Sequence, residues 1–363
     1  MLQPLNKFML NSGIEIEKRS AEKVHRFLIS EKLLEFRLKA LHSAKGEKII
    51  FPVKETPRGK FAELKKIAAS AKLVKKKFSA HEFGPESWAE AVGRKLSASE
   101  KKFMPSSFDS LGDVAIIEIP KELKGKEKVL AEALLRVHKS FESVYMKTGA
   151  HEGVFRQEPV KLLAGKRKKF ATYKEHGCTF HISIGKVFFS PRLSTERKRI
   201  SALIKPGEKV AALFAGTGPF PIVFAKNSKM GEAVAIELNP RAVQDMKENI
   251  RLNRVEGKVE PILGDVKKLA PKFSGKFDRA VMPLPKGGET FLADALKYLK
   301  PEGGVVHFYQ FVSTDSMFAE PLEQIEKACK AQGKKFEVLE KRKVRSYAPD
   351  IVQVVVDFRA WDG

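Results

Sequence analysis

The chain has 363 residues, of which 43% are hydrophobic and 31% charged, a composition typical of globular proteins and not of disordered or membrane-spanning ones. Its 68 lysines and arginines exceed its 44 aspartates and glutamates, which gives a formal net charge of +24. An excess of this size predicts a polyanionic partner, with nucleic acid as the leading candidate, because each neutralised phosphate releases a counterion. The alternative is a basic surface that serves solubility alone.

Cysteine usage and hydropathy exclude several further classes. Two cysteines are too few for a disulfide framework, and no CxxC pair suggests zinc, so we expect no metal. No apolar run approaches the roughly 18 residues that span a bilayer, and the N-terminal MLQPLNKFML lacks the pattern of a signal peptide. We therefore expect a cytoplasmic protein that contacts no membrane. The sequence has no obvious oligomerisation stripe, so a monomer is expected.

Residues 1–55 predict a small α/β domain. Apolar residues recur at helical spacing in SAEKVHRFLISEKLLEF (20–36), and EKIIFPV (47–53) has the pattern of a strand. Residues 56–82 are rich in lysine and contain the turn residues Pro57 and Gly59, so they predict a basic linker with a helix in it. A charge run of this kind is more often a solvated face than a binding site.

Two further domains are expected, over 83–168 and 169–363. In the first, DSLGDVAIIEIP (109–120) predicts a strand and GKEKVLAEALLRVHKSFESVYMK (125–147) one long amphipathic helix. From Ile200 onward strands and helices alternate, which predicts an α/β fold with a doubly wound, Rossmann-like sheet. The last long strand, after RSYAPD, is expected to be an added antiparallel edge.

The stretch LFAGTGPFP (213–221) follows the first strand of that sheet. Such sheets bind ligands beyond the carboxyl ends of their strands, and Gly216 and Gly218 permit a tight turn and a close backbone approach there. The third glycine of a dinucleotide loop is missing, because Pro219, Phe220 and Pro221 occupy its place. An NAD enzyme is therefore disfavoured.

Two carboxylates follow the next two strands. Glu237 ends the second strand, about 20 residues beyond the loop, where an acidic side chain can accept hydrogen bonds from ribose hydroxyls. Asp265 ends the third, where a carboxylate and nearby backbone amides could bind an adenine edge. Each alone could be a helix N-cap or a loop acid. With the loop, they indicate a nucleoside without a diphosphate, which fits S-adenosylmethionine better than NAD.

Several motifs carry a resemblance to a known family. FAGTGPFPIVFAK, IELNPRAVQDMKENIRLNRV and DRAVMPLPKGGETFLADAL, with FFSPRLSTERKRI (188–200) upstream, resemble the archaeal and eukaryotic tRNA guanosine-37 N1-methyltransferases. The resemblance covers most of residues 10–360. It implies methyl transfer from S-adenosylmethionine to N1 of guanosine 37 in tRNA. It also implies that residues 83–168 are an RNA-binding domain and that the first domain binds the tRNA elbow.

Methylation at guanine N1 makes two chemical demands. N1 carries a proton at neutral pH, so a general base must remove it, and the negative charge that moves to O6 calls for a cation. The resemblance implies Glu196, in STERKR, as the base and Arg156, in GVFRQE, as the cation. It also implies RNA contacts by Arg192, Arg197 and Lys198. From spacing alone, Glu196 could instead be an ion-paired helix residue and Arg156 a phosphate clamp.

The cofactor contacts that loop, strand ends and resemblance together imply are Arg197, Phe214, Gly216, Gly218, Pro219, Glu237, Leu238, Asp265, Val266 and Pro283. Three departures from the family pattern affect these roles. Ala212 replaces a common acidic residue, so we expect Glu237 to supply its contact. Pro283 replaces the asparagine of an NLP turn, which leaves backbone groups to orient the guanine. FRQEP lacks a second arginine.

Two other functions stay open. A wybutosine-pathway enzyme would use the same cofactor but transfer its aminocarboxypropyl group; the glutamate of SPRLSTER favours methyl transfer. A noncatalytic RNA-binding protein with a decayed fold is disfavoured because Glu237 and Asp265 are both present.

Overall fold

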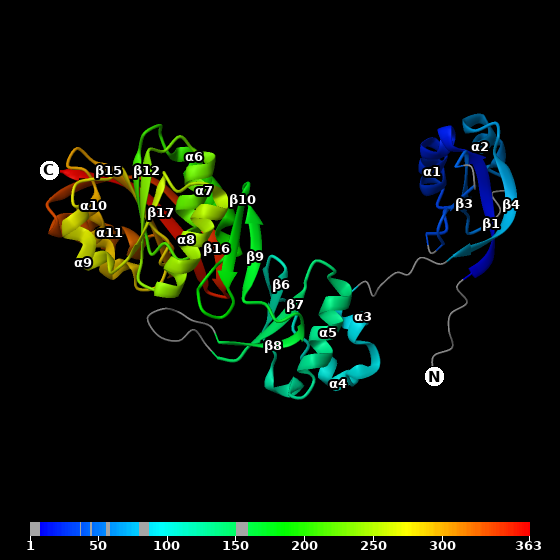
Figure 1. Cartoon of the computed structure of the whole chain (residues 1–363), viewed down its shortest axis with the longest axis horizontal. Coiled ribbons are helices and arrows are strands. Elements are labelled where there is room, and N and C mark those ends of the chain that lie inside the picture. The colour runs from blue at the N-terminus through cyan, green and yellow to red at the C-terminus, as the bar shows by residue number, and fades with distance from the viewer. Residues whose placement is uncertain (1–7, 37, 44–45, 56–58, 80–86, 150–158) are drawn as a thin grey trace. The chain divides into compact units, whose positions relative to one another are not determined.

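The computed structural model describes residues 8–36, 38–43, 46–55, 59–79, 87–149 and 159–363 (Figure 1). The chain divides into two compact units, Met1–Glu86 and Ser87–Gly363. Within the described ranges, no helix is both long enough and apolar enough to cross a membrane.

The first unit is a four-stranded antiparallel sheet with two helices. Its strands lie in the order β2-β3-β1-β4, with β1 at Phe8–Glu17, β2 at Leu41–His42, β3 at Lys48–Pro52 and β4 at Lys72–Ser79. Helices α1 (Ala21–Ser30) and α2 (Phe61–Ile67) bury Val24, Leu28 and Leu64 against Ile14 and Ile16 of β1. The buried set therefore comes from residues on both sides of the predicted domain end at 55.

The prediction of a linker over 56–82 is wrong for the residues that the structure describes there. Strand β4 pairs with β1 from Phe8↔Ser79 to Glu15↔Lys72, and Phe78 is fully buried. The lysines that suggested a linker, Lys72 and 75–77, are exposed on an edge strand. Charged side chains at a sheet edge prevent pairing with other chains, so this run of charge belongs to a folded strand.

The second unit begins with an α/β layer that precedes the large sheet. Its strands lie in the order β5-β6-β7-β8, and their bounds and those of their helices are α3 Trp88–Val92, α4 Ala98–Lys101, β5 Asp109–Leu111, β6 Val114–Ile117, α5 Glu127–Val137, β7 Ser143–Lys147 and β8 Val160–Gly165. The predicted long helix over 125–147 is wrong beyond Val137. Residues 143–147 form β7, parallel to β6 and antiparallel to β8, because burial between two strands overrides their helical spacing.

A hairpin of β9 (Phe170–Glu175) and β10 (Cys178–Ser183) joins this layer to the rest of the unit. The turn before β6 lies directly on β9: a Cβ on Gly112 would stand 1.8 Å from the carbonyl oxygen of Thr172. The Asp113 carboxylate accepts a hydrogen bond from the Thr172 amide at 3.1 Å. Only glycine fits this approach, so the layer is fixed against the hairpin.

The large sheet has seven strands in the order β13-β12-β11-β14-β15-β17-β16. These are β11 Lys209–Leu213, β12 Glu232–Glu237, β13 Val259–Leu263, β14 Arg279–Met282, β15 Gly304–Ser313, β16 Lys334–Ala348 and β17 Ile351–Asp362. The first five in this order are parallel, and β17 is antiparallel to both neighbours. The prediction of a doubly wound, Rossmann-like sheet is confirmed.

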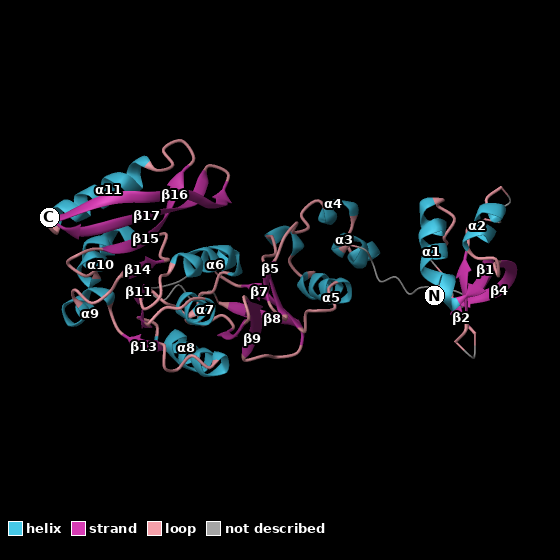
Figure 2. Cartoon of the chain, turned by 90° about the horizontal axis from the view of Figure 1, so that it is seen from above, coloured by secondary structure: helices cyan, strands magenta, loops and turns pink. Residues whose placement is uncertain are grey.

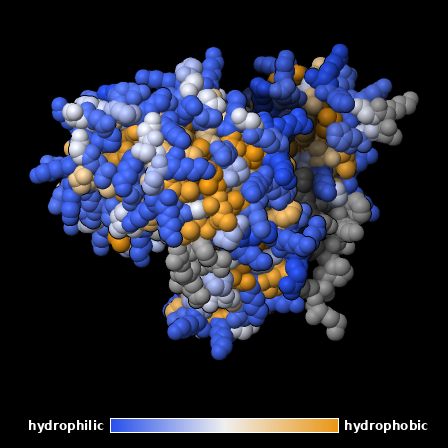
Figure 3. Space-filling view, turned by 60° about the vertical axis from the view of Figure 1, so that its left-hand side comes forward, coloured by the Kyte–Doolittle hydropathy of each residue, from blue (hydrophilic) through white to orange (hydrophobic). Residues whose placement is uncertain are grey.

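Helices cover both faces of the sheet, as Figure 2 shows. Helices α6 (Ser194–Leu203), α7 (Pro219–Asn227) and α8 (Pro240–Asn253) pack on one face, and α9 (Val266–Phe273), α10 (Leu292–Tyr298) and α11 (Ala319–Ala331) on the other. Strand β11 serves both layers, because Val210 and Ala212 face one core while Ala211 and Leu213 face the other. On the face seen in Figure 3, hydrophilic side chains predominate and apolar ones lie among them in patches.

The end of the chain differs from the prediction of one added edge strand. Strand β17 is antiparallel, as expected, but it lies inside the sheet, between β15 and β16. The edge is β16, whose first six residues, KKFEVL, alternate between half-buried and exposed positions and whose next four, EKRK, are all exposed. The unbroken valine run of β17 fits burial on both faces, which explains why it takes the inner place.

The boundary between the units can be tested with two truncated chains. Residues 87–363 should unfold cooperatively, whereas 61–363 should bind the dye ANS more strongly, because β4 has lost β1 and the side chains of Leu64 and Phe78 have lost their core. Dye fluorescence and thermal unfolding measure both effects. Equal dye binding by the two fragments would show that residues 61–79 behave as a linker after all.

Candidate active site

A cavity of about 360 Å³ opens at the carboxyl ends of the parallel strands. Gly216, in the loop after β11, has φ +57° and donates its N–H to Oε2 of Glu237 at 2.8 Å. The amide of Asn239 donates to Oε1 of the same carboxylate, also at 2.8 Å. Two backbone amides thus fix Glu237 at the cavity wall, and its remaining lone pairs can accept ribose hydroxyls.

The third strand end contributes a second fixed carboxylate. Asp265 caps helix α9 by accepting the Lys267 amide on Oδ1 at 2.7 Å, and in the described part of the chain no hydrogen bond to its Oδ2 is present. The apolar walls of the cavity come from Phe214, Ile236, Leu238, Val266 and Phe291. Flat apolar walls with two carboxylates and no cradle for a diphosphate fit the nucleoside of S-adenosylmethionine.

The structure brings seven of the ten predicted cofactor residues to this cavity: Phe214, Gly216, Glu237, Leu238, Asp265, Val266 and Pro283. Gly218 and Pro219 do not line it, because they begin helix α7. Gly218 has φ +84°, and a Cβ there would stand 2.8 Å from Cγ of Met246. These two residues shape the loop and do not contact the cavity.

Arg197 is a correction to the predicted cofactor and RNA contacts. Its side chain is 1% exposed, its guanidinium pairs with Glu175 of β9, with Nη2 to Oε2 at 2.7 Å, and it donates to the carbonyl of Ser190. The rings of Phe189 and Phe220 enclose it at 5.4 and 5.6 Å from their centroids. A cation buried and paired in this way has no surface to offer a phosphate.

Glu196, the predicted base, is 3% exposed. It lines neither the cofactor cavity nor a second cavity, of about 450 Å³, that adjoins it. Its Oε2 accepts hydrogen bonds from the Tyr309 hydroxyl at 2.8 Å and from Nη2 of Arg199 at 2.9 Å. Burial raises the pKa of Tyr309, and the Glu196 charge raises it further, so the hydroxyl stays protonated and donates. The carboxylate is therefore held by these two donors inside the protein, and Nε of Arg342 lies 3.5 Å from its Oε1.

A chain of buried polar groups continues from Arg199. Its Nη1 bonds to Oδ2 of Asp357 at 2.6 Å, and Oδ1 of Asp357 lies 2.7 Å from Nδ1 of His307. Nε2 of His307 lies 2.7 Å from Nη1 of Arg279, which pairs with Glu208. Because arginine can only donate, Nε2 accepts and Nδ1 carries the proton, so His307 is neutral.

The pKa values in this chain follow from its burial. Burial lowers the pKa of His307; Asp357 opposes this, and Arg279 adds to it. Burial alone would raise the pKa of Asp357, but His307 and Arg199 outweigh it and lower the value to about 2. At neutral pH, Asp357 is thus ionised and balances Arg199.

The predicted RNA-binding residues and the predicted O6 cation lie in different surroundings. Arg192 is exposed and pairs with Asp109 of β5 at 2.6 Å. Lys198 is exposed and donates to Asn227 at 2.8 Å. Arg156 lies outside the described residues.

The second cavity adjoins the cofactor cavity. The two share Phe188, Pro283 and Lys286, and the second is completed by Ser190, Leu193, Pro285, Phe311, Arg345, Tyr347 and Gln353. Sequence reasoning missed Phe188 and Lys286 as site residues. Phe188 lies within the motif FFSPRLSTER, and Lys286 directly follows the MPLP turn. Both residues therefore lie in or next to stretches that resemble the family.

Helix α6 and strand β15 place Glu196 behind a wall of this second cavity. Leu193, which lines it, lies one helical turn before Glu196. Phe311, which also lines it, lies two residues after Tyr309 and so on the same face of β15. The Glu196–Tyr309 pair therefore lies on the cavity side of both elements.

The fold and the first cavity define a Rossmann-like methyltransferase that binds an adenosyl cofactor. Residues 171–339 match the TRM5/TYW2 methyltransferase domain, and residues 89–168 match the TYW2 N-terminal domain. A tRNA (guanine(37)-N(1))-methyltransferase of Pyrococcus abyssi, Trm5b, is 35% identical over 347 residues, 96% of this chain and 98% of that protein.

Two further similar proteins are a solved complex with tRNA and an aminocarboxypropyltransferase. The solved complex of aTrm5 and tRNALeu superposes with a TM-score of 0.76 and 31% identity, over 96% of this chain and 99% of the other. A tRNA(Phe) (4-demethylwyosine(37)-C(7)) aminocarboxypropyltransferase of Methanocaldococcus jannaschii is 34% identical over 254 residues, 70% of this chain and 98% of that protein. The chain belongs to the TRM5/TYW2 methyltransferase family. Solved family structures hold S-adenosylmethionine or adenosine, and S-adenosylmethionine is the cofactor.

Glu237→Gln tests the cofactor site. A side-chain amide is uncharged, and it carries only one oxygen for the two amide donors of Gly216 and Asn239. We expect the Kd for S-adenosylmethionine to rise by about 10- to 100-fold, since a hydrogen bond to a charged group is worth about 1.5–3 kcal/mol. Isothermal titration calorimetry measures it, with Glu232→Gln, at the exposed start of the same strand, as the control. An unchanged Kd would remove Glu237 from the site.

The buried His307 predicts acid sensitivity of the second unit. As the pH falls below about 6.5, His307 binds a proton in the unfolded chain but not in the folded chain. The free energy of unfolding should therefore fall by up to about 1.4 kcal/mol per pH unit. Trp88 and Trp361 both lie in this unit, so their fluorescence during denaturant unfolding reports on it. His307→Gln should flatten the slope, and the exposed His42→Gln should not. Equal slopes in wild type and His307→Gln would contradict a neutral His307.

Proposed function

We propose that the chain is a tRNA (guanine(37)-N1)-methyltransferase, which transfers a methyl group from S-adenosylmethionine to N1 of guanosine 37. The observation that carries this is the pair of adjoining cavities, one suited to an adenosyl cofactor and one lined beside it by Phe188, Leu193 and Pro285. A guanine base can stack on an aromatic side chain such as Phe188. The similarity to Trm5b along nearly the whole chain supports the same reaction.

The cofactor supplies an electrophilic methyl group when it is bound. Glu237 and Asp265 hold the nucleoside at the strand ends, and the walls around Phe188 and Pro283 exclude water from the place where the two ligands meet. Pro283 has no N–H, so the guanine is oriented by other groups of that turn. Holding both reactants in line accounts for much of the rate that such a site provides.

Glu196 is the general base in this proposal. To take the N1 proton it must turn from Arg199 toward the second cavity. Such a change does not leave Arg199 as an unpaired buried cation, because Asp357 still pairs with it at 2.6 Å. Tyr309 can donate to the same carboxylate throughout. Arg156 is proposed as the cation that stabilises the charge on O6.

Aminocarboxypropyl transfer is the weaker alternative. The aminocarboxypropyltransferase relative spans 70% of this chain, whereas the methyltransferase relative spans 96%. The part of the chain beyond the shared 70% thus has its counterpart in the methyltransferase.

The remaining parts of the chain receive roles in tRNA binding. We propose that residues 83–168 contact the RNA near the catalytic domain and that the N-terminal unit binds the tRNA elbow. The exposed lysines of its edge strand, Lys72 and 75–77, suit phosphate contacts of that kind. The proposal is completed by tRNA as the partner, a monomeric state, a cytoplasmic location and a reaction without a metal.

Methyl transfer from labelled S-adenosylmethionine tests the reaction and the base together. Two tRNA transcripts differ only at position 37, guanosine or adenosine, and only the first should be labelled. Glu196→Gln should lower kcat by about 10²- to 10⁴-fold, the range for loss of a general base, with a cofactor Kd within twofold of the wild type.

Glu256→Gln is the matched control, because it makes the same chemical change at an exposed residue that lines neither of the two cavities. It should leave kcat within about threefold. Equal labelling of both transcripts would contradict guanosine specificity, and full activity of Glu196→Gln would contradict the base. Transfer of the aminocarboxypropyl group, seen by mass spectrometry, would establish the alternative.

A further inference from the structure

Three side chains from the C-terminal strands form a compact group at the second cavity: Phe311 of β15, and Arg345 and Tyr347 of β16. The rings of Phe311 and Tyr347 have centroids 4.2 Å apart and planes inclined by 35°. The guanidinium carbon of Arg345 lies 5.8 Å from the first centroid and 5.5 Å from the second. We call this group the aromatic–arginine cluster.

One side of the cluster is held by a hydrogen bond to β17, and its other side is exposed to solvent. Nε of Arg345 donates to Oε1 of Gln353 at 2.8 Å, and Gln353 is buried in β17. Tyr347 is 56% exposed. Among the described residues, neither its hydroxyl nor the terminal nitrogens of Arg345 have a hydrogen-bond partner. The ring face and the guanidinium donors are thus fixed in place and available to a ligand.

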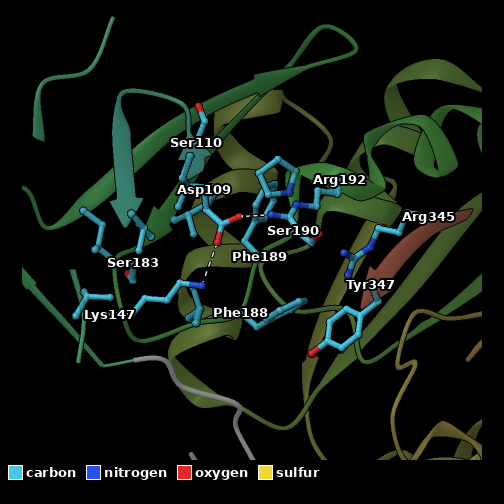
Figure 4. A pocket seen from close by; sticks show the side chains of 18 residues that line it. Asp109, Ser110, Lys147, Ser183, Phe188, Phe189, Ser190, Arg192, Arg345 and Tyr347 are labelled. Carbon is cyan, nitrogen blue, oxygen red and sulfur yellow. Dashed lines mark hydrogen bonds and ion pairs between the residues drawn. The ribbon is translucent and has the colours of Figure 1, made fainter. Parts of the chain in front are cut away.

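Charge around the cluster favours an anion. Burial lowers the pKa of Arg345, and the nearby cation Arg192 lowers it further, against the smaller opposing effects of Tyr347 and Asp109, so a phosphate there would stabilise the charged guanidinium. Figure 4 shows Arg345 and Tyr347 projecting from one side of a neighbouring cavity, with Phe188 between them and the Asp109–Lys147 pair. Phe188 also lines the cofactor cavity. Aromatic faces next to arginine are how proteins hold unpaired nucleotides.

We propose that the aromatic–arginine cluster is a stacking platform for the nucleotide next to the methylated guanosine, with Tyr347 against its base and Arg345 on its phosphate. The proposal rests on the function proposed above. Phe188 and Pro283, which line both the cofactor cavity and the second cavity, lie between the cluster and the cofactor cavity. A guanine that binds beside these two residues brings the adjacent nucleotides of its RNA strand close to the cluster. Bases in an RNA loop are unpaired and can be splayed onto such a surface.

Fluorescence anisotropy with an anticodon stem–loop RNA tests the platform by a thermodynamic cycle. Two further RNAs lack the base at position 36 or at position 38. We expect Tyr347→Ala to weaken binding of the complete RNA by about tenfold, within the range for one stacked base, and Tyr347→Phe to retain wild-type affinity. Removal of the stacked base should weaken binding to the wild type by a similar factor and have little further effect on Tyr347→Ala.

Two controls keep this result separate from folding and from catalysis. Leu339→Ala changes an exposed side chain of the same strand and should leave RNA affinity unchanged. Cofactor Kd and thermal midpoint should be the same in all variants, since Tyr347 is exposed.

The proposal is overturned if Tyr347→Ala binds the complete RNA as well as the wild type does, or if its loss of affinity simply adds to that of both base-lacking RNAs. Methyl transfer by the wild type is measured on the complete RNA in the same preparation. If Tyr347→Ala and removal of the base are coupled but no methyl is transferred, the platform is supported and the proposed function is refuted. If methyl is transferred but the two changes are not coupled, the proposed function is supported and the platform is refuted.

Discussion

The active site depends on charged side chains that helix α6 carries into the interior. Removing a charge from water costs several kcal/mol unless a partner compensates for it. Arg197 is compensated by Glu175 of β9, and Arg199 is compensated by Glu196 of the same helix and by Asp357 of β17. The pairs work only if hairpin, helix and sheet keep their relative places, so the charges fix the wall of the second cavity.

The same arrangement relates stability to chemistry. Arg199 has three carboxylate partners, Glu196, Glu340 and Asp357, so Glu196 can leave without exposing an unpaired cation to the interior. A base with a single buried partner would be held more rigidly, because its departure would cost that partner's full desolvation. The neutral His307 continues the chain on the far side of Asp357 and keeps that carboxylate ionised. The proposed mechanism thus requires a fixed scaffold and one carboxylate, Glu196, that changes partners.

The sequence was informative wherever a local pattern determines the outcome. Alternating strands and helices predicted the sheet, and the ends of its strands predicted Glu237 and Asp265 at the cavity. Patterns failed where tertiary contacts decide. Strand β7 looked like the end of a helix and β4 like a linker, because pairing with distant strands sets both.

Side-chain burial was the other source of error. Arg197 has the sequence context of an RNA contact, and only the fold reveals Glu175 beside it. The spacing of charges in the sequence allowed Glu196 to be either a base or an ion-paired helix residue. In the structure it is paired with Arg199 and lies behind the wall of the second cavity. Phe311, Arg345 and Tyr347 come together from strands separated by helix α11, so no local motif could have linked them.

The most direct test is a crystal structure of the protein with S-adenosylhomocysteine and an anticodon stem–loop containing guanosine 37. If Glu196 is the base, its carboxylate will have left Arg199 and will lie within hydrogen-bond distance of guanine N1, while Arg199 remains paired with Asp357. A guanine bound beside the cofactor with Glu196 still on Arg199 and Tyr309, and another group at N1, would contradict the role given to Glu196.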